Sequence, residues 1–253
     1  MVSVLQAIIL GILQGVTEWL PISSSGHLVI FQTILGVEQP IALDVALHFA
    51  SLFVIVIFFR KRIAELCKKL LKFDRASMRY TAWLLIATLP VAAVGLLYKD
   101  VIESAFTSPR TVGAGLLFTG FLLLASRIRF MTGKLDTFKA SIIGVFQAIA
   151  VFPGISRSGS TIASGLMLGV KREEAAEFSF LLAFPAILGA SILEYEAVLH
   201  SPDILALGAG MAVTIITGLI TLPILMGIIK KDHFHYFGIY CLAVGILTLI
   251  FMH

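Results

Sequence analysis

The sequence predicts an all-α, polytopic membrane protein. We expect one domain of two inverted-topology repeats, each a re-entrant helical hairpin followed by three transmembrane helices. Three observations lead to this prediction. Of the 253 residues, 58% are hydrophobic and only 13% are charged, whereas soluble domains carry about a quarter charged residues. The Lys and Arg residues cluster in short segments between apolar runs, and a serine-rich motif of the first half returns in the second half.

Composition also narrows the function classes. A span needs about 20 apolar residues, so the length allows about six to eight crossings. The basic residues that set the sequence pI near 9.1 lie in a few loops, which does not indicate nucleic-acid binding. Cys67 and Cys241 lie far apart, so we expect free thiols. The N-terminal apolar run has no positive n-region and no A-x-A site, so no cleaved signal peptide is expected.

The basic segments order the crossings of the first half. No Lys or Arg precedes Arg60, and short loops rich in Lys and Arg stay in the cytoplasm. The first residues are therefore expected outside or within the bilayer, and the loop 60–79 is expected in the cytoplasm. A short loop of mixed charge around 99–103 should lie outside. The expected spans are 41–59, 80–97 and 111–126.

The second half begins with a segment that returns to the side it left. Residues 140–170 lie between the basic segments 127–139 and 171–172, both expected in the cytoplasm. The centre of this segment holds Pro153-Gly154, which interrupts a helix. We interpret it as a re-entrant hairpin. The spans expected after it are 177–193, 204–229 and 237–251.

A repeat without gaps connects the two halves. Sliding the sequence by 133 positions lays Q-G-V-T-E-W-L-P-I-S-S-S-G-H (14–27) on Q-A-I-A-V-F-P-G-I-S-R-S-G-S (147–160). Three crossings per half is an odd number, so the second repeat (about 134–253) is inserted upside down relative to the first (about 1–130). Interrupted helices in matching positions of inverted repeats indicate a site near the membrane midplane. We therefore expect the two serine-rich tips to face each other.

The two copies differ at the positions that carry chemistry. Glu18 becomes Val151 in the second copy, Ser24 becomes Arg157, and His27 becomes Ser160. A carboxylate inside the bilayer is costly and usually functional, with a metal or a cation as its partner. Gln14 lies four residues before Glu18, so the two share one helix face. The alternative for Glu18 is a structural ion pair with Arg157.

The serines and glycines of the tips indicate an anion site. Small residues let backbone N–H groups converge on an anion, and a helix N-terminus adds positive potential. Arg157 provides a planar fork that suits phosphate oxygens. His27 is a candidate base, acid or metal ligand. The alternatives are serines that bond to nearby carbonyls and a histidine that only packs.

Other polar residues have a simpler explanation. His48 is placed to face the same cavity, but an ordinary hydrogen-bonding role is favoured. Glu173, Glu174 and Glu177 begin a helix, where acids complement the dipole. The cationic stretch 60–79 is interpreted as a topology determinant that contacts anionic lipids.

These motifs resemble those of the undecaprenyl-diphosphate phosphatase family, which is associated with bacitracin resistance. The resemblance rests on Gln14-x-x-x-Glu18, on the Ser-Ser-Ser-Gly-His run and on P-G-I-S-R-S-G-S-T at 153–161. It covers the whole chain in length, motif order and hydropathy. In this family, the first position of the first motif is either Glu or Gln. Here the residue is Gln14, which removes one carboxylate ligand for a metal.

The resemblance implies a membrane enzyme that releases the terminal phosphate of a C55 polyprenyl diphosphate, so that the monophosphate carrier is recycled for cell-wall synthesis. Ser24 is the expected nucleophile and His27 the expected base. The alternative that His27 itself attacks, or activates water, while Ser24 only positions the phosphate stays open. The expected catalytic residues are Glu18, Ser24, His27 and Arg157, with Glu18 also holding a divalent cation, Mg²⁺ or Ca²⁺. The expected substrate-binding residues are Gln14, Ser23, Ser25, Gly26, Ser156, Ser158, Gly159 and Thr161.

The rival hypothesis is a polyprenyl-phosphate transporter or flippase, because inverted repeats with broken helices are transporter architecture. Either function implies lipid partners, no nucleic acid and a bacterial cytoplasmic (inner) membrane, with the site opening toward the outer, periplasmic face. The sequence leaves open a homodimer, the preferred metal and the tolerated prenyl length.

Overall fold

The computed structural model describes residues 2–37 and 41–252, and the regular elements of these residues are helical, as the sequence predicts. The first half contains α1 (Val4–Thr17), α2 (Ser24–Ile34), α3 (Ile41–Phe58), α4 (Arg60–Leu71), α5 (Arg75–Leu97), α6 (Lys99–Phe106) and α7 (Pro109–Ala125). The second half contains α8 (Thr137–Ile149), α9 (Arg157–Met167), α10 (Arg172–Leu193), α11 (Tyr195–Leu199), α12 (Ile204–Lys230), the 3₁₀ turn η1 (Phe234–Tyr236) and α13 (Phe237–Phe251).

The long apolar helices confirm a multi-pass membrane protein. Within the described residues, five helical segments are long and apolar enough to cross a membrane: α3, α5, α10, α12, and η1 together with α13. A sixth is counted if α6 and α7, which are bent by 97° against each other, form one span. The upper end of the predicted range, eight crossings, is therefore too high, because the short helices of the hairpins use up the remaining apolar length.

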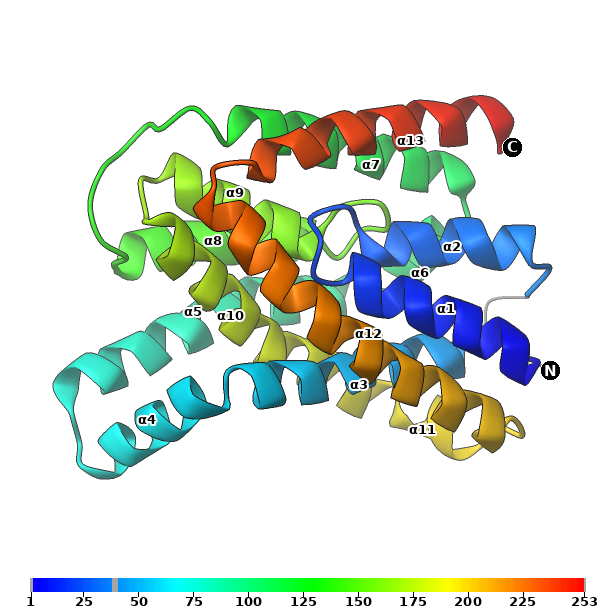
Figure 1. Cartoon of the computed structure of the whole chain (residues 1–253), viewed down its shortest axis with the longest axis horizontal. Coiled ribbons are helices and arrows are strands. Elements are labelled where there is room, and N and C mark those ends of the chain that lie inside the picture. Colours follow the sequence, from blue (N-terminus) through cyan, green and yellow to red (C-terminus); the bar gives the residue numbers. More distant parts are fainter. Residues whose placement is uncertain (1, 38–40, 253) are drawn as a thin grey trace.

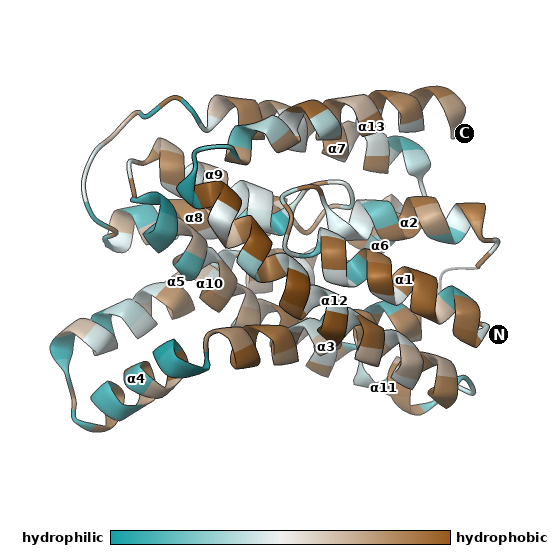
Figure 2. Ribbon diagram, viewed as in Figure 1, coloured by the Kyte–Doolittle hydropathy of each residue, from teal (hydrophilic) through white to brown (hydrophobic). Residues whose placement is uncertain are grey.

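Two segments that the sequence predicted as loops are helical, namely α4 and α6, and a short helix, α11, lies between two of the expected spans. Helix α4 is rich in charge, and Figure 2 shows it as one of the most hydrophilic parts of the chain. Its Lys69 Nζ lies 2.6 Å from Glu65 Oε1, one turn away, and this bond holds the pKa of the Glu65 carboxyl below its usual value. Such i,i+4 pairs stabilise a surface helix. A high content of charged residues is therefore compatible with a helix in this segment.

The basic segments gather at one end of the bundle. Arg62 of α4 donates to Glu177 of α10 across 2.7 Å, and Arg172 lies 2.5 Å from Asp232, just after α12. Figure 1 shows α4 at this end, and the start of α1 and the end of α13 at the other. The basic segments therefore share one side, as the sequence predicts. The terminal residues 1 and 253, which were expected outside, lie outside the described residues.

Corresponding helices of the two halves pack in corresponding ways. Helix α1 lies along α12 as α8 lies along α5, α3 contacts α12 as α10 contacts α5, and α7 lies along α13. A Cβ atom added to Gly11 would come within 2.5 Å of the Gly210 carbonyl oxygen, and one added to Gly144 within 2.6 Å of the Ala87 oxygen. Gly11 and Gly144 are 133 positions apart. In both halves, glycine lets the hairpin helix approach its partner closely.

The two unwound tips meet at the centre of the bundle (Figure 1). A Cβ atom added to Gly26 would lie 2.9 Å from Gly154 Cα, and one added to Gly159 would lie 3.3 Å from the Pro21 oxygen. The shift of 133 positions carries Gly26 to Gly159 and Pro21 to Gly154. The contact of Gly26 with Gly154 and the contact of Gly159 with Pro21 are therefore equivalent in the two copies.

Candidate active site

Each tip ends in a serine that caps the following helix. Ser23 Oγ accepts a hydrogen bond from Gly26 N at 3.2 Å, and Ser156 Oγ accepts one from Gly159 N at 3.0 Å. These two serines therefore do what serines commonly do at a helix start. The next residue in each copy occupies the first helical position, and there the copies differ: Ser24 begins α2, whereas Arg157 begins α9.

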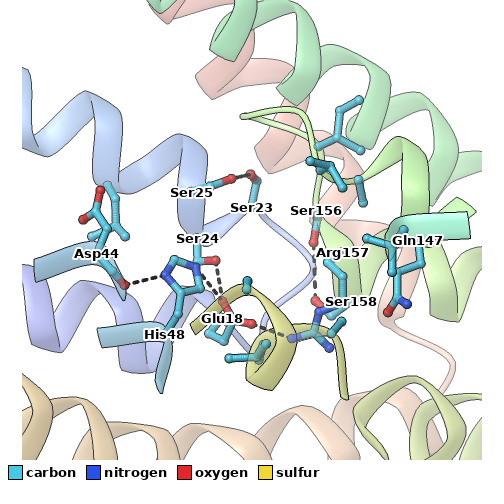
Figure 3. Close-up of a pocket in the computed structure, with 18 of the residues that line it drawn as sticks. Glu18, Ser23, Ser24, Ser25, Asp44, His48, Gln147, Ser156, Arg157 and Ser158 are labelled. Atoms are coloured by element: carbon cyan, nitrogen blue, oxygen red, sulfur yellow. Dashed lines mark hydrogen bonds and ion pairs between the residues drawn. The ribbon is translucent and has the colours of Figure 1, made fainter. Parts of the chain in front are cut away.

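The Glu18 carboxylate joins these two residues. Ser24 Oγ donates to Glu18 Oε2 at 2.5 Å, and Arg157 Nη2 donates to Glu18 Oε1 at 2.5 Å. Gln14 Nε2 also donates to Oε2, at 3.2 Å. Glu18 is 6% exposed, and Figure 3 shows it between Ser24 and Arg157. A hydroxyl of the first tip and a guanidinium of the second thus share one buried carboxylate.

His48 of α3 is the fourth group at this carboxylate. Its Nε2 lies 3.7 Å from Glu18 Oε2, and its Nδ1 lies 2.8 Å from the backbone oxygen of Asp44 (Figure 3). A carbonyl oxygen only accepts, so Nδ1 carries a hydrogen and Nε2 is the atom turned toward Glu18. The sequence analysis favoured an ordinary hydrogen-bonding role for His48, and the structure places it beside the central carboxylate.

Asp44 is a site residue that the sequence analysis passed over. It lines the same cavity as Glu18, and its Oδ1 accepts a hydrogen bond of 2.6 Å from Gln32 Nε2. A signal was present in the sequence, because Asp44 and His48 are four apart within an apolar run. The same spacing argument had been applied to Gln14 and Glu18.

These polar groups line a cavity of about 320 Å³. Its volume lies in the range of small-molecule sites, about 300–1,000 Å³. Its polar wall comes from both tips, from α3 and from the end of α10. The polar lining residues include Glu18, Ser23, Ser24, Ser25, Asp44, His48, Gln147, Ser156, Arg157 and Ser158.

His27 is not among the residues that line this cavity. Its Nδ1 lies 2.8 Å from the Ser23 oxygen, and its Nε2 lies 2.8 Å from the hydroxyl of Tyr240 on α13. The two rings are stacked with centroids 5.7 Å apart. The ring is thus drawn toward α13, and both of its nitrogens have partners there. The structure does not bring His27 to Glu18.

The backbone conformation of Ser23 explains the structural role of His27. Ser23 has φ +68°, a conformation that costs a residue other than glycine roughly 1–3 kcal/mol. The backbone N–H of His27 and its ring Nδ1 both donate to the Ser23 carbonyl, at 3.1 and 2.8 Å. The equivalent Ser156 has φ −72° and no such strain. His27 therefore fixes the strained peptide immediately before Ser24.

The remaining predicted site residues lie around the cavity rather than in it. Gly26 and Gly159 form the close tip contacts, and Gln14 supports Glu18. Thr161 is fully buried, with its Oγ1 2.5 Å from Ser179 Oγ. These residues shape the tips, whereas Ser24, Arg157 and the cap serines reach the cavity wall.

A divalent cation fits this donor set only in part. Within the described residues, no group of three or more His, Cys, Asp or Glu side chains is arranged to hold a metal. Both Glu18 oxygens already accept hydrogen bonds. Three carboxylates, those of Glu18, Asp44 and Glu194, do line the cavity, and the buried Gln14 Oε1 has no hydrogen-bond partner. Mg²⁺ is usually held by one or two carboxylates plus substrate phosphates, so the residues suit a cation shared with a phosphate.

Comparison with known proteins agrees over nearly the whole chain. The family described as bacitracin resistance protein BacA matches residues 7–247. Similar proteins named undecaprenyl-diphosphatase include one from Korarchaeum cryptofilum, 40% identical over 98% of each chain. Others come from Methanosphaera stadtmanae, 41% identical over 99% of this chain and 98% of the relative, and from Christiangramia forsetii, 37% identical over 99% of each. With its broken-helix tips and the matching sequence profile, the chain belongs to the bacitracin resistance protein BacA family.

Proposed function

We propose that the chain is a membrane phosphatase that hydrolyses a polyprenyl diphosphate to the monophosphate and inorganic phosphate. The substrate is undecaprenyl diphosphate, as the names of the relatives indicate, and the product is the lipid carrier recycled for cell-wall synthesis. One observation carries the proposal. The hydroxyl of Ser24 and the guanidinium of Arg157 come from different tips and meet at Glu18 inside one cavity.

Ser24 is the nucleophile and Glu18 takes its proton, in place of the His27 expected from the sequence. The Ser24 Oγ–Glu18 Oε2 distance of 2.5 Å is that of a charge-assisted O–H···O⁻ bond. Ser24 Oγ attacks the terminal phosphorus, its proton passes to Glu18, and the bond from that phosphorus to the bridging oxygen breaks. The prenyl monophosphate leaves with the electron pair and receives the proton from Glu18.

Water completes the reaction at the phosphoserine. Glu18 takes a proton from the attacking water, the bond between phosphorus and Ser24 Oγ breaks, and the proton returns to that oxygen. His48 Nε2 lies 3.7 Å from Glu18 Oε2 and helps to orient this carboxylate. His27 acts through the backbone, since it fixes the Ser23 carbonyl beside the nucleophile.

Arg157 binds the phosphate oxygens. Its Nη2 is held by Glu18, but its Nη1 makes only a long contact of 3.5 Å with the Ser179 oxygen. One arm of the fork is therefore available for a phosphate oxygen. The starts of α2 and α9 add backbone N–H groups and positive potential on both sides of the cavity. Together these groups stabilise the charge that develops on the transferred phosphate.

Glu18 and Asp44 would hold a divalent cation, Mg²⁺ or Ca²⁺, together with the substrate phosphates. When bound, it neutralises part of the diphosphate charge. The cation is part of the proposal, because carboxylates of this kind suit it. Loss of turnover in chelator supports it, and full turnover in chelator removes it.

We also infer that the domain consists of two inverted repeats, about 1–130 and 134–253. The equivalent tip contacts and the corresponding helix pairs support this. The basic end should face the cytoplasm of the bacterial inner membrane, which leaves the cavity opening toward the periplasm. In a variant without native cysteines, a cysteine at Lys69 should resist an impermeant reagent in intact cells, and one at His200 should react. The reverse pattern contradicts this orientation.

The transporter alternative is not favoured, because the relatives described above are named for hydrolysis. A homodimer remains a prediction, and light scattering of the purified protein in detergent tests it. The function itself is tested by phosphate release from a C55 diphosphate. The wild-type protein and the Ser24→Ala variant are purified in the same way and compared. Release by the first preparation alone supports the proposal, and no release by either overturns it.

A further inference from the structure

Gln147 holds the place in the second hairpin that Gln14 holds in the first. The two residues are 133 positions apart, and both side chains are buried, with exposed fractions of 1% for Gln147 and 0% for Gln14. Gln14 Nε2 donates a hydrogen bond to Glu18. The residue of the second copy that corresponds to Glu18 is Val151, so Gln147 has no carboxylate to support. The reaction proposed above also gives Gln147 no role.

A contact with α5 fixes the orientation of the Gln147 amide. Its Nε2 donates to the backbone oxygen of Ala87 across 3.4 Å. Because a carbonyl oxygen only accepts hydrogen bonds, the amide cannot be turned round to place Oε1 at this position. Gln147 Oε1 therefore lies on the other edge of the amide, where no described residue gives it a hydrogen-bond partner. A buried acceptor without a partner is costly and rare in native proteins.

Gln147 lines the cavity that contains the Glu18 carboxylate. In Figure 3 it lies on the Arg157 side of this cavity, away from Glu18. Three other acceptor side chains line the same cavity, and each accepts a hydrogen bond from another side chain: Glu18, Asp44 and Glu194. Gln147 Oε1 thus differs from them as a neutral acceptor without a donor. A molecule inside the cavity can supply that donor.

A phosphate group that carries a proton is such a molecule. Its unprotonated oxygens only accept, and they suit the free arm of the Arg157 fork and the helix starts. Its P–O–H group, in contrast, needs an acceptor. At neutral pH, inorganic phosphate keeps at least one P–O–H group, and the terminal phosphate of a diphosphate exists partly in a protonated form. Sulfate has the same tetrahedral shape but carries no proton.

We propose that Gln147 Oε1 accepts a hydrogen bond from the protonated oxygen of a phosphate group bound at Arg157. The inference rests on the proposed function, since it names the form of phosphate that the same site takes. Gln147 is then a specificity residue that selects phosphate over tetrahedral anions without a proton. The physical reason is that a site with a buried polar group rejects an analogue that leaves this group unpaired.

Anion binding measures this selection directly. The purified full chain in detergent is titrated with inorganic phosphate and with sulfate, and each dissociation constant is taken from the rise in unfolding temperature. Wild-type protein should bind phosphate roughly tenfold more tightly than sulfate, or by about 1.4 kcal/mol. Gln147→Met keeps the length of the side chain without the amide acceptor, so it should bind the two anions about equally.

Stability distinguishes this role from a structural one. Gln147→Met removes a buried acceptor that has no partner, so the variant should unfold at no lower temperature than wild type. The matched control is Gln6→Met on α1, outside the cavity, because the Gln6 amide accepts from Ser3 N and donates to the Leu35 oxygen. This control should unfold at a lower temperature and keep the preference for phosphate.

The result that overturns the inference is a preference for phosphate that is absent in wild type or unchanged in Gln147→Met. If Gln147→Met does not fold, Gln147→Leu replaces it. Failure of both variants to fold shows a structural side chain and also overturns the inference.

Turnover of C55 diphosphate identifies which phosphate uses the contact. If KM rises in Gln147→Met, the terminal phosphate of the substrate donates to Gln147. If KM is unchanged while the preference for phosphate is lost, the released inorganic phosphate does so. Both results support the inference. Hydrolysis by wild type without a preference that depends on Gln147 refutes this inference alone, and such a preference without hydrolysis refutes the phosphatase alone.

Discussion

Removal of the Arg157 guanidinium tests whether the two tips form one site. In Arg157→Ala, Glu18 keeps Ser24, Gln14 and His48 as neighbours but loses its permanent cation. Breaking a buried pair costs about 3–5 kcal/mol. Arg157 is 16% exposed, so we expect the lower end, roughly 3 kcal/mol, as a fall in thermal stability. Turnover should fall by about 10²–10³ through loss of charge stabilisation in the transition state.

Companion variants separate stability from catalysis. Arg157→Lys keeps the charge without the fork, so it should retain most of the stability and lose much of the turnover. The double variant Glu18→Gln with Arg157→Met removes both charges, so it should recover stability while turnover stays lost. Arg110→Ala, at an exposed position of α7, is the control. Thermal unfolding and phosphate release are measured on the same preparations. A folded Arg157→Ala protein with near-normal hydrolysis refutes the reasoning.

Three further predictions concern strain, metal and the histidines. In thermal unfolding, Ser23→Gly should be more stable than Ser156→Gly by roughly 1–3 kcal/mol of unfolding free energy, because of the two serines only Ser23 has a positive φ to relieve; equal stabilities contradict the strain. Chelator should abolish phosphate release and Gln14→Glu should be tolerated, since it adds a carboxylate beside Glu18; undiminished release in chelator removes the cation. His48→Ala should lower kcat more than His27→Ala, whose main effect should be on stability; the reverse order restores His27 as the catalytic base.

The sequence was sufficient for the parts of the fold that depend on local composition. Apolar runs and the basic residues after them located α3, α5, α7, α10, α12 and α13 to within a few residues. The 133-residue shift and the Pro153-Gly154 interruption located both hairpins. A span must satisfy its own backbone in lipid, so its presence can be read without knowledge of its neighbours.

What the sequence did not reveal depends on contacts between distant segments. His27 follows the tip motif directly, and nothing in the motif indicates that Tyr240 of α13 draws its ring away from Glu18. His48 and Asp44 stand as single polar residues in an apolar run, and their importance comes from the tip packed beside them. The positive φ of Ser23 is likewise a property of the assembled tips.

Charge composition was ambiguous for the segment after α3. A cationic loop and an amphipathic helix at a membrane surface share the same residues. The choice for 60–71 depended on pairs such as Glu65 with Lys69 and on the contact of Arg62 with α10. Only the first of these can be seen from sequence spacing.

Phosphate release by Ser24→Ala tests the central claim most directly. The measurement follows inorganic phosphate from a C55 diphosphate with wild type, Ser24→Ala and Ser141→Ala, whose hydroxyl bonds only within α8. Loss of a nucleophile costs several orders of magnitude, so Ser24→Ala should lose nearly all turnover while it stays folded, and Ser141→Ala should match wild type. If folded Ser24→Ala retains a substantial fraction of wild-type turnover, Ser24 does not attack the phosphorus, and the covalent mechanism at Glu18 is wrong.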